Sequence, residues 1–172
     1  MKVLIVGCGG AGKSTLARHL GATSGLPVIH LDAEYWHAGW HEPTAEEWRE
    51  RVGELAAAPA WIMDGNYSGT IKQRVADADL VVILDRPRLV CLANVVRRRW
   101  QHRGTTRPDM AAGCLERLDP KFLKWIWDYP KVSGPKVRQR LAEADFDRIV
   151  TLRTKHDIEQ FVETFADAPP PG

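Results

Sequence analysis

The residues best suited to chemistry stand near the start of the chain, in the loop Gly7-Cys8-Gly9-Gly10-Ala11-Gly12-Lys13-Ser14. The spacing GxxxxGK[ST] is typical of a loop whose backbone N–H groups surround phosphate oxygens, because glycines let the backbone approach closely. Lys13 is expected to reach the β- and γ-phosphates of a nucleotide, and the Ser14 hydroxyl is expected to ligate Mg²⁺. We therefore predict a nucleotide-phosphate site made of Gly7, Gly9, Gly10, Ala11, Gly12, Lys13, Ser14 and Thr15.

The elements on either side of this loop have the order that a phosphate site requires. An apolar run at residues 3–6 precedes the loop, and residues 16–20 read as the start of a helix. The positive end of the helix dipole then lies at the phosphate. An ordinary glycine turn is the alternative interpretation, and the flanking strand and helix favour the phosphate site over it.

Length and composition fit one globular domain. The chain has 172 residues, of which 44% are hydrophobic and 27% are charged, as in an ordinary soluble protein. Its net charge of +2 is too small to indicate a nucleic acid or an acidic membrane as a partner. We expect a single domain over residues 1–166, with a lid at about 102–120, and a disordered tail over 167–172, where three prolines precede the final glycine.

Cysteine usage and hydropathy predict a cytoplasmic location. Cys8, Cys91 and Cys114 form no CxxC pair, so that neither a disulfide framework nor a zinc site is indicated. The N-terminal apolar run stops at Gly7, well short of a secretory signal. No segment approaches the roughly 20 apolar residues of a membrane span.

Apolar runs alternate with helical patterns along the chain, which is typical of a parallel α/β sheet. We expect strands at residues 3–6, 27–32, 61–63, 80–84 and 148–152. Further helices are expected after a capping box at Thr44 and Glu47, and at residues 87–100, 122–127, 135–144 and 157–165. In the helix at 87–100, the expected buried stripe is Leu89, Leu92, Ala93 and Val96, and the polar side opposite it is Asn94, Arg97, Arg98 and Gln101.

Three of the expected strands end in an acid, namely Asp32, Asp64 and Asp85. Ligands of open parallel sheets bind at the carboxyl ends of the strands, so these acids belong to the same rim as the glycine loop. Asp64 either supports the metal or only caps the turn before Gly65. Asp32 has three interpretations: a general base, a group that binds an amine or sugar hydroxyl without chemistry, or a simple cap.

Arginines are concentrated between residues 97 and 107. Bidentate arginines clamp the charge that builds up during phosphoryl transfer, and a glycine-containing segment can close over a site. We therefore expect Arg98, Arg103 and Arg107 to act as clamp and lid, and Arg97 and Arg99 to be solvated or paired with acids. A solvated basic face and a nucleic-acid patch are the alternatives.

Aromatic and amide side chains flank the same rim. Trp36, Trp40 and Tyr67 either line a specificity pocket or fill gaps in the core, and Asn66 precedes Tyr67. His37 and His41 are four residues apart, but Gly39 lies between them, which argues against a helical two-histidine metal site. Cys8 lies near a helix start, which predicts a lowered pKa for its thiol and sensitivity to oxidation.

Several short motifs together resemble one known family, the topology modulation proteins, a branch of the adenylate-kinase-like nucleotide kinases. The matching motifs are GCGGAGKST at 7–15, HLD at 30–32, WIMDGNY at 61–67, LDRPR at 84–88, RGTTRPDM at 103–110 and ERLD at 116–119. The resemblance covers nearly the whole chain. It implies a three-layer P-loop NTPase fold with helices on both faces of a five-stranded parallel sheet in the order 2-3-1-4-5. It further implies a substrate-binding segment after the second strand and a lid after the fourth.

The resemblance also implies roles for single residues. Lys13 and Ser14 fall on the positions that bind phosphate and Mg²⁺, and Asp64 on the acid that supports the metal through water. Arg98 falls on a phosphate clamp, and Arg103 and Arg107 fall on lid arginines. One departure is Asn94, which stands where these kinases usually carry an arginine that stacks on adenine. This departure puts a strict preference for ATP over GTP in doubt.

Taken together, these features predict an ATP- and Mg²⁺-dependent kinase acting on a small acceptor, a nucleotide or a nucleoside. Ser14 and Asp64 would hold the metal, and Asp32, with Asn66 or Tyr67, would orient the acceptor. Two rivals are an ATP-binding regulatory module with slow hydrolysis and a nucleic-acid-associated protein that uses the arginine-rich helix. Acidic residues that interrupt the basic charge argue against the nucleic-acid-associated protein. The sequence leaves the acceptor and the oligomeric state open.

Overall fold

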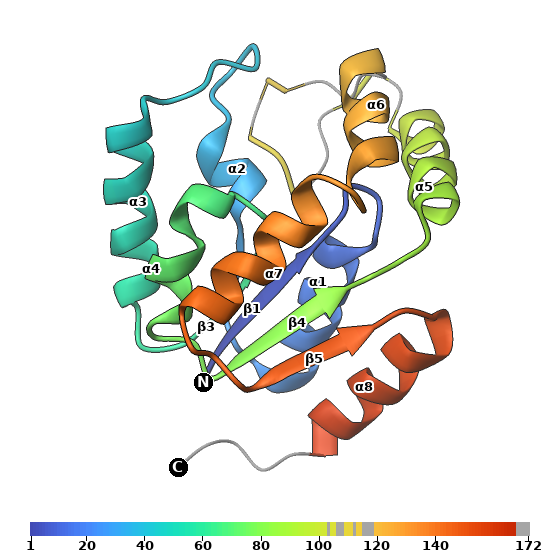
Figure 1. The fold of residues 1–172 in the computed structure, drawn as a ribbon. Coiled ribbons are helices and arrows are strands. Elements are labelled where there is room, and N and C mark those ends of the chain that lie inside the picture. The colour runs from blue at the N-terminus through green and yellow to red at the C-terminus, as the bar shows by residue number, and fades with distance from the viewer. Residues whose placement is uncertain (103, 106–108, 112, 115–118, 168–172) are drawn as a thin grey trace.

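The structure is a computed structural model that describes residues 1–102, 104–105, 109–111, 113–114 and 119–167. Its centre is a five-stranded sheet in the order β2-β3-β1-β4-β5, and all neighbouring strands pair in parallel (Figure 1). This confirms the predicted fold class and strand order. The strands are β1 (Lys2–Gly7), β2 (Val28–His30), β3 (Trp61–Asp64), β4 (Leu80–Leu84) and β5 (Ile149–Leu152).

Helices connect the strands, as a parallel sheet requires. They are α1 (Lys13–Ser24), α2 (Leu31–Tyr35), α3 (Ala45–Ala57), α4 (Ile71–Val75), α5 (Arg88–Gln101), α6 (Pro120–Asp128), α7 (Ser133–Glu143) and α8 (Lys155–Asp167), with the short 3₁₀ turn η1 at Ser68–Thr70. Within the described part of the chain, no helix combines the length and the apolar character that crossing a membrane requires.

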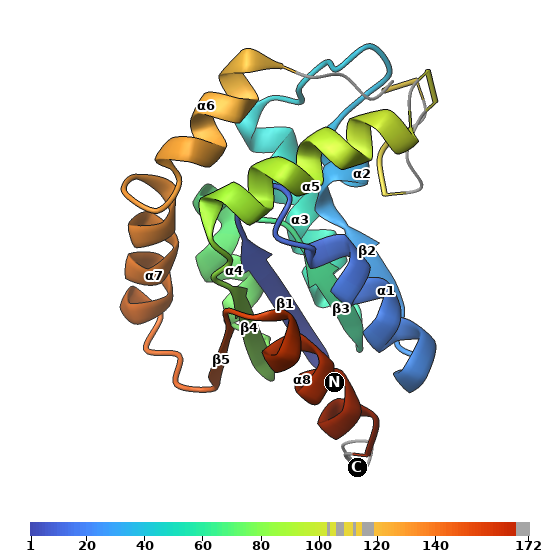
Figure 2. The ribbon, with the colours of Figure 1, turned by 90° about the vertical axis from the view of Figure 1, so that its right-hand side faces the viewer.

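The two faces of the sheet carry separate hydrophobic cores. Val3 and Ile5 of β1 point to one face and pack with residues of α1, α5, α6 and α8. Leu4 and Val6 point to the other face and pack with residues of α3, α4 and α7. Successive side chains of a strand alternate between faces, so that a central strand covered on both sides reads as a continuous apolar run. The helices therefore form the two outer layers of a three-layer fold (Figures 1 and 2).

Capping residues account for where α3 and α6 begin. Thr44 and Glu47 form the expected capping box, in which the Thr44 side chain accepts from the Glu47 N–H at 3.2 Å and Glu47 accepts from the Thr44 N–H at 2.8 Å. Helix α6 begins at Pro120, two residues before the expected start at 122, because Asp119 caps it by accepting from the Lys121 N–H at 2.8 Å.

Three short elements were not predicted, namely α2, η1 and α4. The strand expected at 27–32 ends at His30, so that Asp32 lies in α2 and not at a strand end. That part of the prediction is wrong, because the backbone turns into a helix directly after His30. All three elements span five residues or fewer and thus lack the repeated apolar period that identifies a longer helix.

The expected buried stripe of α5 is wrong for Leu89, Ala93 and Val96, whereas Leu92 is partly buried against the core. Leu89 is 66% exposed and Val96 is 42% exposed, whereas Cys91 and Val95 are buried. The buried residues Cys91 and Val95 lie against Gly10 of the glycine loop and belong to the core on that face of the sheet. Its outer side consequently leaves large apolar groups in solvent.

Candidate functional site

The glycine loop joins β1 to α1 and presents the start of that helix to a cavity. Gly12 is the N-cap of α1 with φ 101°, and no side chain caps the helix, so its first N–H groups are left for a ligand. Gly10 has φ 78°, and a Cβ there would lie 2.2 Å from the Cys91 carbonyl oxygen of α5. Residues 9–15 line the cavity. Gly7 lies at the start of the loop, where its N–H donates to Asn66 Oδ1 at 2.9 Å.

Lys13 spans the loop from the first turn of α1. Its ammonium nitrogen Nζ donates to the carbonyl oxygens of Gly7 at 3.0 Å and Cys8 at 3.1 Å. An ammonium group held by two carbonyls beside uncapped helix N–H groups gives this part of the cavity a positive potential. The arrangement suits the phosphate groups of a nucleotide.

Ser14, Asp64 and His30 form a hydrogen-bonded chain beside the loop. The Ser14 hydroxyl donates to Asp64 Oδ2 at 2.8 Å, and His30 Nδ1 lies 2.5 Å from Asp64 Oδ1. Asp64 is 4% exposed. Burial by itself lowers the pKa of His30, but the hydrogen bond and charge of Asp64 outweigh it, and the net pKa shift is upward. Sequence reasoning placed Ser14 and Asp64 together and missed His30.

This group suits Mg²⁺ by the chemistry of its donors. Mg²⁺ prefers hard oxygen ligands and commonly takes one or two from the protein, with the rest from phosphates and water. Ser14 and Asp64 supply a hydroxyl and a carboxylate next to the loop. Because the Ser14 proton is directed to Asp64, both lone pairs of its oxygen face away from that bond and are left for a cation.

The opposite side of the cavity is formed by α2, the loop after it and the turn after β3. Asp32 Oδ1 accepts from the Tyr67 hydroxyl at 2.8 Å. Burial, followed by the charge and hydrogen bond of Asp32, raises the pKa of Tyr67, so the hydroxyl stays protonated and donates. Trp36 and Trp40 lie edge to face with ring centroids 5.3 Å apart. Both tryptophans line the cavity, as do Asp32, Asn66 and Tyr67.

Arg74 of α4 bonds the backbone of the turn at residues 65–67, a role that the sequence analysis did not predict. Its guanidinium is fully buried and donates to the carbonyl oxygens of Gly65 at 3.0 Å, of Tyr67 at 3.1 Å, and of Asn66. Burial lowers the pKa of Arg74 to about 9, which leaves the group charged at neutral pH. These bonds stabilise Tyr67 in the left-handed region, at φ 34°. Arg74 thus fixes the backbone that carries two predicted acceptor residues.

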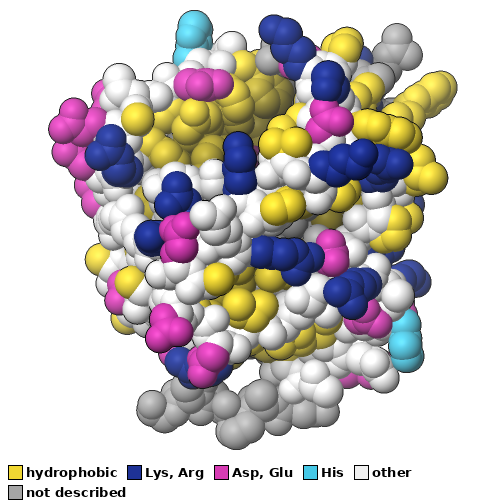
Figure 3. Space-filling model, in the orientation of Figure 1, with side chains coloured by type: hydrophobic (Ala, Val, Ile, Leu, Met, Phe, Trp, Pro, Cys, Tyr) yellow, Lys and Arg dark blue, Asp and Glu magenta, His cyan; other side chains and the backbone are white. Residues whose placement is uncertain are grey.

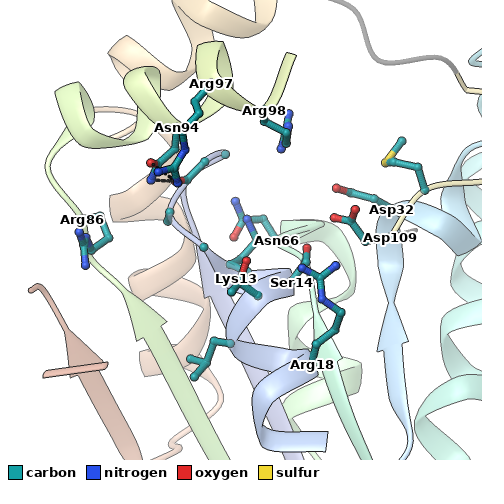
Figure 4. A pocket seen from close by; sticks show the side chains of 18 of the residues that line it. Lys13, Ser14, Arg18, Asp32, Asn66, Arg86, Asn94, Arg97, Arg98 and Asp109 are labelled. Atoms are coloured by element: carbon teal, nitrogen blue, oxygen red, sulfur yellow. Dashed lines mark hydrogen bonds between the residues drawn. The ribbon is translucent and has the colours of Figure 1, made fainter. Parts of the chain in front are cut away.

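Helix α5 contributes its polar side to the cavity. Asn94 Nδ2 donates to the Gly10 carbonyl oxygen at 2.9 Å, so this side chain holds the glycine loop. Arg98 lies one turn further along and extends toward the space above Lys13 and Ser14 (Figure 4). Arg97 also lines the cavity and is exposed to solvent, in agreement with the expectation that it is solvated. The predicted lid arginines, Arg103 and Arg107, lie outside the described residues.

One cavity of about 1100 Å³ joins these groups. Figure 3 shows it as a hollow lined by hydrophobic side chains, at the end of the molecule where the strands end. Figure 4 shows Asp32 and Asp109 pointing into it from one side and Lys13 with Ser14 from another. Its lining includes further residues that sequence reasoning did not select, among them Arg18, Arg86, Asp109, Met110, Phe122 and Trp125.

Asp85 directly follows β4, as expected, whereas the prediction for Cys8 is corrected by the structure. Asp85 forms ion pairs with Arg138 at 2.9 Å and Arg153 at 3.3 Å, and so ties the end of β4 to α7 and to the segment after β5. Cys8 is buried, and a hydrogen bond with the Cys91 thiol, followed by burial, raises the pKa of the Cys8 thiol. The prediction of a lowered pKa is wrong because the thiol is buried in the core beside Cys91.

Solved structures of small-molecule kinases share this fold. Shikimate kinase from Acinetobacter baumannii, in complex with shikimate, has a TM-score of 0.62 and 18% identity over 95% of this chain and 89% of its own. Shikimate kinase from Bacteroides thetaiotaomicron has a TM-score of 0.57 and 16% identity over 97% and 96%. Deoxyadenosine kinase from M. mycoides, with bound dCTP, has a TM-score of 0.51 and 13% identity over 98% and 100%.

No protein-family model matches the chain, and no curated protein matches its sequence. The resemblance to the topology modulation proteins is therefore not confirmed and stays a prediction. Identities below 25% establish the fold alone. On that ground, the chain has the P-loop kinase fold.

Proposed function

We propose that this chain is a kinase that transfers the γ-phosphoryl group of ATP to a small acceptor. One observation carries the proposal: a phosphate-binding loop with Lys13 and Ser14 shares a single cavity with a separate polar and aromatic group around Asp32 and Tyr67. An enzyme that only hydrolyses ATP has no need of a second site facing the first. Solved structures with the same fold include kinases of small molecules.

On the donor side, phosphoryl transfer depends mainly on position and charge. The uncapped start of α1 and the Lys13 ammonium would bind the phosphates, and Arg98 would neutralise charge on the transferring group from the opposite side. Ser14 and Asp64 would hold Mg²⁺, which supplies positive charge to the phosphate oxygens when bound. We also propose Arg103 and Arg107 as lid groups, from the resemblance and the segment in which they lie.

On the acceptor side, Asp32 would bind the hydroxyl that receives the phosphoryl group. Tyr67 donates to Asp32 Oδ1 and so occupies one oxygen of the carboxylate, and we assign the other oxygen, Oδ2, to the acceptor. A carboxylate in hydrogen-bond reach of a hydroxyl can orient it and take its proton. Trp36 and Trp40 would cover an apolar or ring-shaped part of the acceptor. We infer a nucleoside or nucleotide as the first class to test, with other hydroxylated ring compounds such as shikimate beside it.

An acceptor panel tests the proposal. ADP formation from ATP and Mg²⁺ is measured with nucleosides including deoxyadenosine, nucleoside monophosphates, shikimate and other hydroxylated metabolites. We expect one class to raise turnover at least about tenfold over hydrolysis without acceptor, and Lys13→Ala to abolish the gain. Equal turnover with every acceptor and without one would contradict the kinase and leave the regulatory ATP-binding module as the better account.

A further inference from the structure

His30 lies outside the glycine loop but contacts Asp64, one of the two residues proposed to hold the metal. It is the last residue of β2, and in the parallel register it lies directly opposite Asp64 of β3, which in turn lies opposite Ile5 of β1. Neighbours at one register position point to the same face of a sheet. Ile5 belongs to the core under α1, so His30 and Asp64 point to the face that carries Ser14.

The contacts of Asp64 show what His30 does there. Ser14 bonds one carboxylate oxygen, Oδ2, at 2.8 Å, and His30 bonds the other, Oδ1, at 2.5 Å. The terminal torsion of aspartate is soft, so one hydrogen bond leaves the plane of the carboxylate poorly defined. Two bonds from opposite sides fix that plane. The side chains of His30 and Asp64 are only 14% and 5% exposed, so the pair is largely shielded from solvent.

We infer that His30 is a positioning residue for the metal-holding pair Ser14 and Asp64. It acts through Asp64: by fixing the carboxylate it keeps Oδ2 aimed at the Ser14 proton, and the lone pairs of the Ser14 oxygen stay directed away for a cation. The inference rests on the proposed function, because it assigns His30 to the Mg²⁺ of the donor half. It concerns nucleotide and metal binding, and so it does not depend on the acceptor.

Loss of the His30 side chain is expected to reduce the amount by which Mg²⁺ raises the affinity for a nucleotide. Loss of a group that orients a metal ligand typically weakens metal affinity about 10- to 100-fold. For His30→Ala we expect the Mg²⁺-dependent gain in affinity for AMPPNP, a non-hydrolysable ATP analogue, to fall about tenfold. Affinity for AMPPNP in EDTA should change little, because the groups expected to bind the phosphates are Lys13, which bonds the carbonyls of Gly7 and Cys8, and the N–H groups at the start of α1.

The measurement is titration calorimetry with AMPPNP in Mg²⁺ and in EDTA. Because both affinities come from the same preparation of each variant, a partly unfolded fraction cancels in their ratio. His30→Asn, whose amide nitrogen takes about the position of Nδ1, should restore most of the ratio. Val28→Ala is the matched control: it removes partly buried methyl groups from the same strand, and it should lower stability while leaving the ratio unchanged.

A double-mutant cycle shows whether His30 acts through Asp64. In an Asp64→Asn background, His30→Ala should cause no further loss of the Mg²⁺-dependent gain. An equal loss in both backgrounds, or a loss for His30→Ala no larger than for Val28→Ala, overturns the inference. Failure of the donor half of the proposed function looks different: the unmodified chain would then bind AMPPNP with no dependence on Mg²⁺, or not at all. Failure of the acceptor half alone appears in the acceptor panel and leaves these affinities unchanged.

Discussion

Asp32 and Tyr67 are the residues on which the proposed acceptor half of the site depends. Their side chains meet at 2.8 Å although they are 35 positions apart in the chain. Tyr67 occupies one oxygen of the carboxylate and keeps its own proton, because burial and the negative charge of Asp32 raise its pKa. This pair can therefore hold an acceptor hydroxyl in a single orientation, which phosphoryl transfer to that hydroxyl requires.

Asp32→Asn tests this role. We expect kcat/KM for the acceptor to fall by about 10²- to 10⁴-fold, because the amide no longer accepts the hydroxyl proton, while the affinity for MgATP stays the same. Steady-state kinetics with both substrates varied gives the two values. Asp77→Asn is the control, because that exposed carboxylate pairs with Lys2 at the opposite end of β1. Unchanged acceptor kinetics in Asp32→Asn would remove Asp32 from the site.

At the scale of elements, the turn after β3 is held by helix α4. Arg74 brings a charged group into a fully buried place, where its two terminal nitrogens donate to backbone carbonyl oxygens of residues 65–67. Buried charges are tolerated only when they are well bonded, and removal of the donor leaves the acceptors without partners. The same turn carries Asn66, which bonds the N–H of Gly7 at the start of the glycine loop. Helix α4 therefore positions parts of both halves of the site.

Arg74→Met is expected to lower the free energy of unfolding by about 2–4 kcal/mol, because it leaves buried carbonyl groups unsatisfied. Urea unfolding measures the loss. Lys72→Met on the same helix is the control, since it breaks only an ion pair with Glu143 in which the lysine side chain is 53% exposed. Pairs of that kind contribute about 1 kcal/mol or less. Equal losses in the two variants would contradict the role given to Arg74.

At the scale of the whole molecule, the cavity is lined by segments from both ends of the chain. Groups from the glycine loop, α2, α5, α6 and α8 meet in it, although they are spread over most of the sequence. A nucleotide bound in the cavity, as proposed, would contact elements that pack on different strands. Binding to the folded state alone then stabilises the entire domain by mass action.

MgATP at a hundred times its dissociation constant should stabilise the folded chain by about 2.7 kcal/mol. For a domain of this length, that corresponds to a rise in Tm of roughly 5–10 °C. Thermal unfolding followed by tryptophan fluorescence measures the rise. Lys13→Ala, folded but deprived of the phosphate contact, should show little of it. A rise of the same size in Lys13→Ala would mean that the nucleotide binds elsewhere.

Local features of the sequence determined the parts of this protein that depend on near neighbours in the chain. The glycine loop between an apolar strand and a helix, the capping box at Thr44 and the buried central strands were all predictable, because each is specified within about a dozen residues. The family resemblance added the strand order. Ser14 and Asp64 were paired correctly, since the carboxyl ends of adjacent parallel strands meet at one edge of the sheet.

Only the tertiary structure decided which groups meet across the site and which side of a helix is buried. Periodicity shows which residues of α5 share a side, but Cys91 and Val95 are buried because α5 packs on the glycine loop, an arrangement between distant segments. The contacts of His30 with Asp64 and of Arg74 with the turn at 65–67 likewise join separate elements. Their physical cause is the register of β2 on β3 and the docking of α4 beneath that turn, which no short stretch of sequence encodes by itself.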